Sequence, residues 1–133
     1  MLRVGADCAG LNLVCVALDI LGVRPDLIFA PEKEKATRAM TKHNFPIAPG
    51  GMCPDIMSRD GATLAAVDIY TAGPPCQSFS LAGKHAGLRD AKGCVFVRVL
   101  NTIKTAKPAR FILENAQDLK ARQRGHTRCE PKC

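Results

Sequence analysis

The chain has 133 residues, of which 47% are hydrophobic and 23% are charged, so it is long enough for one globular domain and too apolar to be disordered throughout. An aromatic content of 5% excludes a surface built from many stacked rings, and the short apolar runs exclude a membrane-spanning helix. The net charge of +7 favours an anionic partner. Because no charged leader precedes the first apolar residues, we expect an intracellular protein, nuclear in a eukaryote and in the cytoplasm or nucleoid of a bacterium.

Seven cysteines at irregular spacing include no CxxC pair, so we expect neither a zinc ribbon nor a dithiol redox motif. Near the end of the chain, His126, Cys129 and Cys133 offer at most three ligands, and we expect no metal there. Most of the thiols should be small buried apolar groups. Cys76 is the exception, because its neighbours in the sequence suggest a chemical role.

Hydrophobic patterning in the first half predicts strands that alternate with helices. A strand over residues 2–7 ends at a turn of small residues, and apolar residues at three- and four-residue steps then predict a helix that ends at Gly22. A strand over residues 25–30 precedes a helix over residues 32–44, and a weaker strand is expected near residues 52–56.

The second half continues the alternation with a strand over residues 67–72, a long polar loop, a helix around residues 95–103 and a strand over residues 109–113. Strands and helices at this spacing indicate right-handed βαβ units and therefore an α/β fold with a Rossmann-like open parallel sheet. After residue 119 the pattern becomes polar, basic and unperiodic.

Ligands bind open parallel sheets beyond the carboxyl ends of the strands, and the unusual residues of this chain fall there. The first turn contains a single glycine, Gly10, and Glu32 follows the second strand about 20 residues later, the distance at which an acid binds ribose hydroxyls. One glycine does not cradle a pyrophosphate, so the pattern favours an adenosyl ligand without phosphates over NAD. The alternative is a plain turn with a solvated Glu32.

Residues 73–80, with the sequence GPPCQSFS, are the most informative segment. Two prolines fix the backbone before Cys76, a rigid way to present a nucleophile that needs local activation to ionise. Glu114 ends the next predicted strand and could meet Cys76 around one small planar ring. A thiolate can add to a pyrimidine while a partly desolvated acid protonates its ring nitrogen.

Together these segments resemble the N-terminal catalytic portion of the cytosine-5 DNA methyltransferase family, over about residues 3–127. Residues 73–80 resemble the nucleophile motif of the family, residues 87–93 the segment before its next helix, and residues 111–115 its Glu-Asn-Val motif. The resemblance implies the fold of S-adenosylmethionine-dependent methyltransferases, incomplete on its C-terminal side.

The resemblance also implies roles for individual residues. Cys76 would attack carbon 6 of a flipped cytosine, and Glu114 would protonate ring nitrogen 3, so that carbon 5 accepts the methyl group of S-adenosylmethionine. The implied cofactor pocket has Asp7, Cys8, Ala9, Gly10 and Leu11 at the methionine part, Glu32 at the ribose, Asp55 and Ile56 at the adenine, and Gly73, Pro75 and Val95 around them. Duplex DNA would contact a loop that includes Gln77, Ser78, Ser80, Lys84, Arg89 and Lys92.

Some positions depart from the family pattern. Cys8, Asn12 and Leu13 stand where the family has a phenylalanine and a second pair of glycines. We expect residues 1–119 to form a partial catalytic domain and residues 120–133 a basic tail, disordered or non-homologous, and we expect the chain alone to be inactive because a target-recognition region is missing. The alternatives are methylation of transfer RNA, a non-catalytic fragment that binds cofactor or nucleic acid, and an inert product. The oligomeric state is not predicted.

Overall fold

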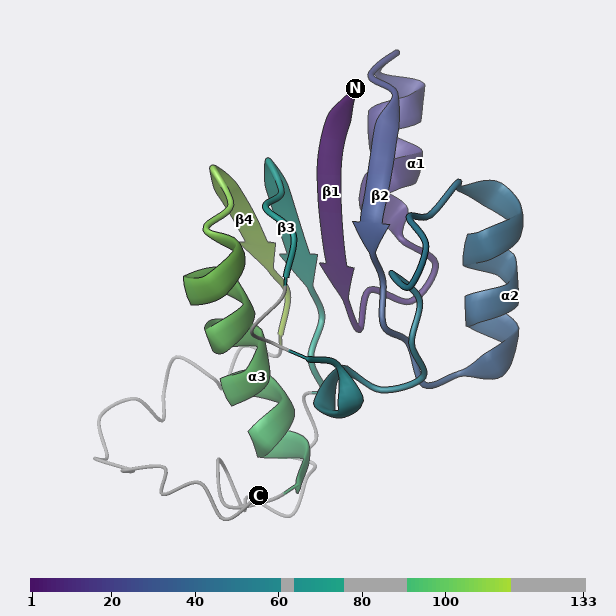
Figure 1. Cartoon of the computed structure of the whole chain (residues 1–133). Helices are drawn as coiled ribbons and strands as arrows, with labels where there is room; N and C mark the ends of the chain where they lie inside the picture. Colours follow the sequence, from purple (N-terminus) through teal and green to yellow (C-terminus); the bar gives the residue numbers. More distant parts are fainter. Residues whose placement is uncertain (61–63, 76–90, 116–133) are drawn as a thin grey trace.

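The computed structural model describes residues 1–60, 64–75 and 91–115, with only the main chain of residues 91–93 (Figure 1). Four parallel strands form one sheet in the order β2-β1-β3-β4. The strands are β1 (Leu2–Asp7), β2 (Pro25–Phe29), β3 (Ile69–Ala72) and β4 (Arg110–Leu113), and the helical elements are α1 (Leu13–Ile20), α2 (Lys35–Asn44), the 3-10 turn η1 (Ile56–Ser58) and α3 (Ala91–Ala106).

The strand β1 lies inside the sheet and pairs with β2 on one side and with β3 on the other. The chain therefore moves outward to β2 first and then crosses back to β3 and β4. Such a reversal of strand order opens a crevice at the carboxyl ends of the two central strands, here β1 and β3. Within the described residues, β4 is an edge strand.

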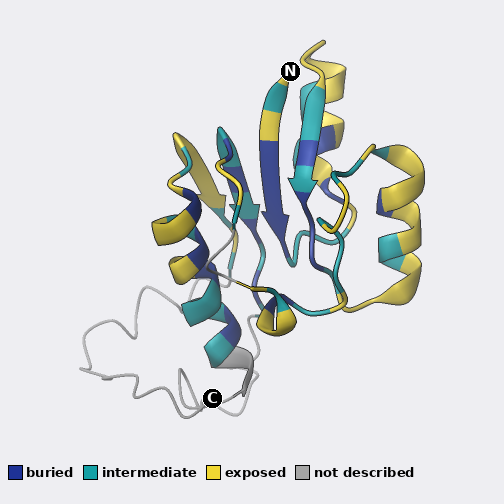
Figure 2. Ribbon diagram, viewed as in Figure 1, coloured by how far each residue is buried: buried dark blue, intermediate teal, exposed yellow. Residues whose placement is uncertain are grey.

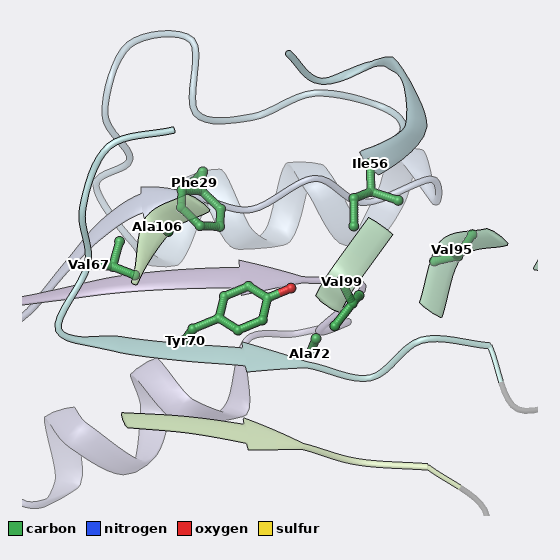
Figure 3. Packing of buried hydrophobic residues seen from close by; sticks show 8 residues of the cluster. All are labelled: Phe29, Ile56, Val67, Tyr70, Ala72, Val95, Val99 and Ala106. Atoms are coloured by element: carbon green, nitrogen blue, oxygen red, sulfur yellow. The ribbon is translucent and has the colours of Figure 1, made fainter. Parts of the chain in front are cut away.

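The hydrophobic core divides into two clusters on opposite faces of the sheet. The first lies between the sheet and α3, where Tyr70 and Val99 are both fully buried (Figure 3). The second lies between the first two strands and α1, and it includes Val4, Cys15 and Leu27. Figure 2 shows buried residues continuing along β1 to its carboxyl end, so the strand reaches the crevice as a rigid support.

The predicted α/β parallel sheet is confirmed, with element ends shifted by a few residues. Gly22 has a φ of 72°, a left-handed conformation that glycine adopts without strain, just after α1. The second helix begins at Lys35 rather than residue 32, because the Glu34 side chain caps it by accepting from the Ala36 amide at 3.4 Å.

The strand expected near residues 52–56 is wrong. Pro54 cannot donate to a sheet ladder, and the Asp55 carboxylate accepts from the Met57 amide at 3.0 Å, which starts η1 instead. Ile56, whose apolar side chain suggested a strand, packs into the first core cluster. In the described part of the chain, no helix is long and apolar enough to cross a membrane. The predicted tail, residues 120–133, lies outside the described residues.

Candidate functional site

The strand register aligns the carboxyl ends of three strands. Asp7 of β1 pairs with Ala72 of β3, and Ala72 pairs with Leu113 of β4. The next residue on each strand is Cys8, Gly73 and Glu114, so three of the predicted site residues lie in one row at the crevice.

Gly73 is the point where this row is tightest. A Cβ atom on Gly73 would lie 3.3 Å from the carbonyl oxygen of Cys8 and 3.5 Å from Oε2 of Glu114. Its amide donates to the Asp7 carbonyl at 3.2 Å, and the Glu114 amide donates to the Ala72 carbonyl at 3.0 Å. The missing side chain therefore allows the turn after β1 and the Glu114 carboxylate to approach the same backbone position.

A second contact holds the proline turn that follows β3. The side-chain amide of Asn115 donates to the carbonyl oxygen of Pro74 at 3.0 Å. This bond links Asn115, just after β4, to Pro74, which precedes Pro75 and Cys76 in the chain. Cys76 itself lies outside the described residues, as do Gln77, Ser78, Ser80, Lys84 and Arg89, while Lys92 lies in the first turn of α3.

Glu114 is exposed in the structure. An acid that protonates a ring nitrogen near pH 7 was expected to be partly removed from water, and the structure does not give Glu114 that environment. Because β4 pairs with β3, Glu114 lies beside Gly73 at the end of the neighbouring strand, but its side chain is open to solvent.

Asp7 is fully buried at the end of β1, and its carboxylate is held on both oxygens. Arg59 donates to Oδ1 at 2.5 Å and to Oδ2 at 2.8 Å, and the Tyr70 hydroxyl donates to Oδ2 at 2.7 Å. Burial, followed by the charge of Asp7, raises the pKa of Tyr70 well above its usual range, so the hydroxyl keeps its proton. The Asp7 side chain is thus committed to the protein interior, and a cofactor contact from Asp7 can come only from its main chain.

The turn after β1 adopts an unusual backbone. Cys8, Gly10 and Asn12 all have positive φ angles, of 51°, 54° and 54°. Only Gly10 takes this conformation without strain. A side chain at Gly10 would meet nothing within 4 Å, so the turn faces open space.

The Cys8 thiol is half-buried beneath this turn. Burial, with added contributions from the carboxylates of Asp7, Glu32 and Asp55, raises its pKa from 9.0 to about 12. Cys8 is therefore a neutral thiol near pH 7, unsuited to nucleophilic chemistry. Arg59 neutralises Asp7, but Glu32 and Asp55 leave negative charge around Cys8, which suits a sulfonium cation and opposes a pyrophosphate.

Two half-buried acids follow β2 and precede η1. Glu32 accepts from the Glu34 amide at 3.0 Å, and its own amide donates to the Cys53 carbonyl at 3.1 Å. Asp55 caps η1 and pairs with Lys33 at 3.1 Å, in an exposed ion pair. A carboxylate accepts about four hydrogen bonds, so both acids retain capacity for hydroxyl or amino groups of a ligand. These features fit S-adenosylmethionine.

The remaining predicted pocket residues divide by burial. Ile56 is 3% exposed and Val95 is 6% exposed, and both belong to the first core cluster, so little of either side chain is open to a ligand. Leu11 is 46% exposed, and Ala9 and Pro75 are half-buried. In the part of the chain that the structure describes, no group of three or more His, Cys, Asp or Glu residues could hold a metal ion.

Sequence reasoning missed the cluster around Asp7. Arg59, Tyr70 and Thr102 come from three distant segments, and Arg59 also donates to Thr102 at 2.7 Å. The one available signal was a carboxylate, Asp7, at the end of an apolar strand, because a buried charge requires a partner.

Comparison with known proteins adds to this geometry. Residues 8–130 match the family described as C-5 cytosine-specific DNA methylase. The chain is 37% identical over 100 residues to the Type II methyltransferase M.NgoBI of Neisseria gonorrhoeae, covering 75% of this chain and 31% of that protein. It is 34% identical over 119 residues to the Type II methyltransferase M.HaeII of Haemophilus aegyptius, covering 90% and 36%. The chain thus spans about a third of the length of these relatives.

The crystal structure of the Dnmt2 methyltransferase of S. pombe is similar to this structure. The TM-score is 0.62 at 20% sequence identity, and the match covers 92% of this chain and 38% of that one. At this identity the likeness establishes the fold, which is the Rossmann-like parallel sheet that the sequence predicted.

Proposed function

Because the chain belongs to the C-5 cytosine-specific DNA methylase family, we propose that it forms the cofactor-binding and catalytic part of a DNA (cytosine-5-)-methyltransferase. The proposed cofactor is S-adenosylmethionine and the proposed substrate is cytosine in duplex DNA. Since the chain spans about a third of its relatives, we expect it to bind the cofactor without transferring methyl groups by itself.

The proposed pocket uses the acids and the open turn at the carboxyl ends of β1 and β2. Glu32 would accept from the ribose hydroxyls, and Asp55 would accept from the adenine amino group. The main chain of residues 7–11, which faces open space at Gly10, would hold the methionine part. S-adenosylmethionine, when bound, supplies an electrophilic methyl group on its sulfonium sulfur.

The proposed catalytic residues are Cys76 and Glu114. The Cys76 thiolate would form a bond to carbon 6 of the flipped cytosine while Glu114 donates a proton to ring nitrogen 3, which makes carbon 5 nucleophilic. After methylation of carbon 5, water would take the carbon-5 proton, the Cys76 sulfur would leave as a thiolate, and ring nitrogen 3 would return its proton to Glu114, which restores the ring. Glu114 is exposed here, so a base seated over it would supply the removal from water that an acid at neutral pH requires.

The observation that carries this proposal is the meeting of both halves of the site at Gly73. The cofactor turn, through the Cys8 carbonyl, and the carboxylate of Glu114 lie within 3.5 Å of one added Cβ position. In direct transfer, the methyl carbon of the donor and carbon 5 of the cytosine approach to about 3–3.5 Å. The acid that contacts this cytosine must therefore lie next to the methyl donor.

Cofactor binding tests the first half of the proposal. Isothermal titration of the purified chain with S-adenosylhomocysteine should give a dissociation constant in the micromolar range, and Glu32→Ala should weaken binding at least tenfold. Asp19→Ala, on the exposed face of α1, is the matched acidic control and should leave binding unchanged. No binding by the original chain at millimolar ligand would contradict the pocket.

A test of catalysis supplies the part of the relatives that this chain does not cover. A chimera that joins residues 1–119 to the remaining part of M.HaeII should transfer tritiated methyl groups to duplex DNA. Cys76→Ser should abolish transfer, whereas Cys94→Ser, in the half-buried part of α3, should preserve it. Transfer that survives Cys76→Ser would refute the assigned nucleophile.

A further inference from the structure

The side chain of Arg59 is 10% exposed and joins three parts of the fold that sequence alone does not connect. It directly follows η1 in the chain, forms the two-bond ion pair with Asp7 at the end of β1, and donates to Thr102 on α3. Its guanidinium carbon lies 4.6 Å from the ring centroid of Phe29, which adds a cation–π contact.

The main chain of η1 is held from the other side by α3. Arg98 donates to the carbonyl oxygen of Ile56 at 3.4 Å and to that of Arg59. Arg98 therefore holds the segment from Asp55 to Arg59 by its backbone. Arg59, the last residue of that segment, anchors it through its own side chain. Of these two arginines, Arg59 is the one that donates to the Asp7 carboxylate at the end of β1, just before the turn.

We propose that Arg59 is a positioning residue whose buried guanidinium fixes the segment bearing Asp55 and Ile56 against the turn that follows β1, and so sets the affinity of the site for S-adenosylmethionine. This inference rests on the proposed function for its ligand. A planar guanidinium can hold both carboxylate oxygens and the Thr102 hydroxyl at once, whereas an ammonium is a single point charge. Lysine at this position would preserve the charge and lose the geometry.

The test compares Arg59→Lys with Val99→Ala in the full 133-residue chain. Val99 is fully buried on α3, so its truncation destabilises the fold without touching the ion pair. Titration with S-adenosylhomocysteine, at a temperature where all proteins are folded, should show at least a tenfold loss of affinity for Arg59→Lys and less than a twofold loss for Val99→Ala. Equal losses in the two variants would overturn the proposal.

A second readout does not depend on the ligand. Amide order parameters for Met57 and Ser58 should fall from about 0.85 to below 0.6 in Arg59→Lys and stay high in Val99→Ala. If the original chain fails to bind the ligand, the proposed function fails, and these order parameters still decide whether Arg59 positions η1. Unchanged values in Arg59→Lys would refute it.

A paired variant covers the case in which Arg59→Lys does not fold. Asp7→Asn combined with Arg59→Gln removes both buried charges together, so no uncompensated ion remains. The same loss of affinity and of local order is expected for it. Retention of both properties would overturn the proposal.

Discussion

Replacing Asp7 by asparagine should destabilise the fold far more than an average substitution. The carboxylate is fully buried and takes two hydrogen bonds from Arg59 and one from Tyr70. The amide side chain has nearly the same shape but carries no charge, so the Arg59 guanidinium, at 10% exposure, remains buried without a counterion. Breaking a buried pair in this way costs about 3–5 kcal/mol, against a total stability of about 5–15 kcal/mol for a domain.

The assay is a double-mutant cycle in urea. Asp7→Asn, Arg59→Met and the double variant are unfolded with urea, and the free energies are compared at equal m values. We expect each single variant to lose about 3–5 kcal/mol and the double variant to lose much less than their sum, with a coupling energy above about 2 kcal/mol.

The ion pair between Lys33 and Asp55 provides the matched control. Its lysine is 73% exposed and its carboxylate 30% exposed, with a separation of 3.1 Å. Water screens this pair, so its own cycle should give a coupling of about 0–1 kcal/mol. A coupling between Asp7 and Arg59 no larger than that of the exposed pair would refute the reasoning, because burial would then contribute nothing.

Three further predictions follow from single contacts. Gly73→Ala should weaken S-adenosylhomocysteine binding at least tenfold in isothermal titration, because its Cβ would lie 3.3 Å from the Cys8 carbonyl and displace the turn; unchanged affinity would contradict this. Asn115→Ala should cost about 1 kcal/mol in urea unfolding by removing the bond to Pro74, and Asn115→Asp, which cannot donate there, should cost no less. Burial raises the pKa of Cys15 from 9.0 to about 11, so its contribution to the free energy of unfolding is complete below pH 9. That contribution falls by about 1.4 kcal/mol per pH unit as the pH rises toward 11. In urea unfolding, Cys15→Ala should flatten this dependence of the unfolding free energy on pH, and an unchanged dependence would count against it.

The sheet and its helices could be predicted because each element is encoded by local periodicity. In the described part of the chain, the four strands of the sheet and the three helices of more than one turn were expected within a few residues of their observed ends. The region near residues 52–56 could not be assigned correctly from its apolar residues, since its structure is decided by the capping of η1 through Asp55 and by the missing donor at Pro54. There the side-chain hydrogen bond outweighs the hydrophobic pattern.

The candidate site was predictable where its residues follow strands directly. Cys8, Gly73 and Glu114 lie in one row because parallel strands in register end together, and sequence order alone shows which residue follows each strand. Arg59 was not predictable, because its partner Asp7 is distant in sequence and its loop has no periodicity. Nor could the sequence show that Glu114 is exposed, since exposure depends on what packs over the end of β4.

The buried pair also determines which charges the site presents. Arg59 neutralises Asp7 within the protein, so Glu32 and Asp55 are the carboxylates that remain around Cys8, the latter offset in part by Lys33. Both remaining acids are the residues proposed to bind the adenosine part of the ligand. An Asp7 without its arginine would add a third negative charge beside Cys8, whose thiol already responds to all three carboxylates. Arg59→Lys retains this neutralisation and changes only the geometry, so a loss of affinity in that variant reports the position of η1 rather than the charge of the site.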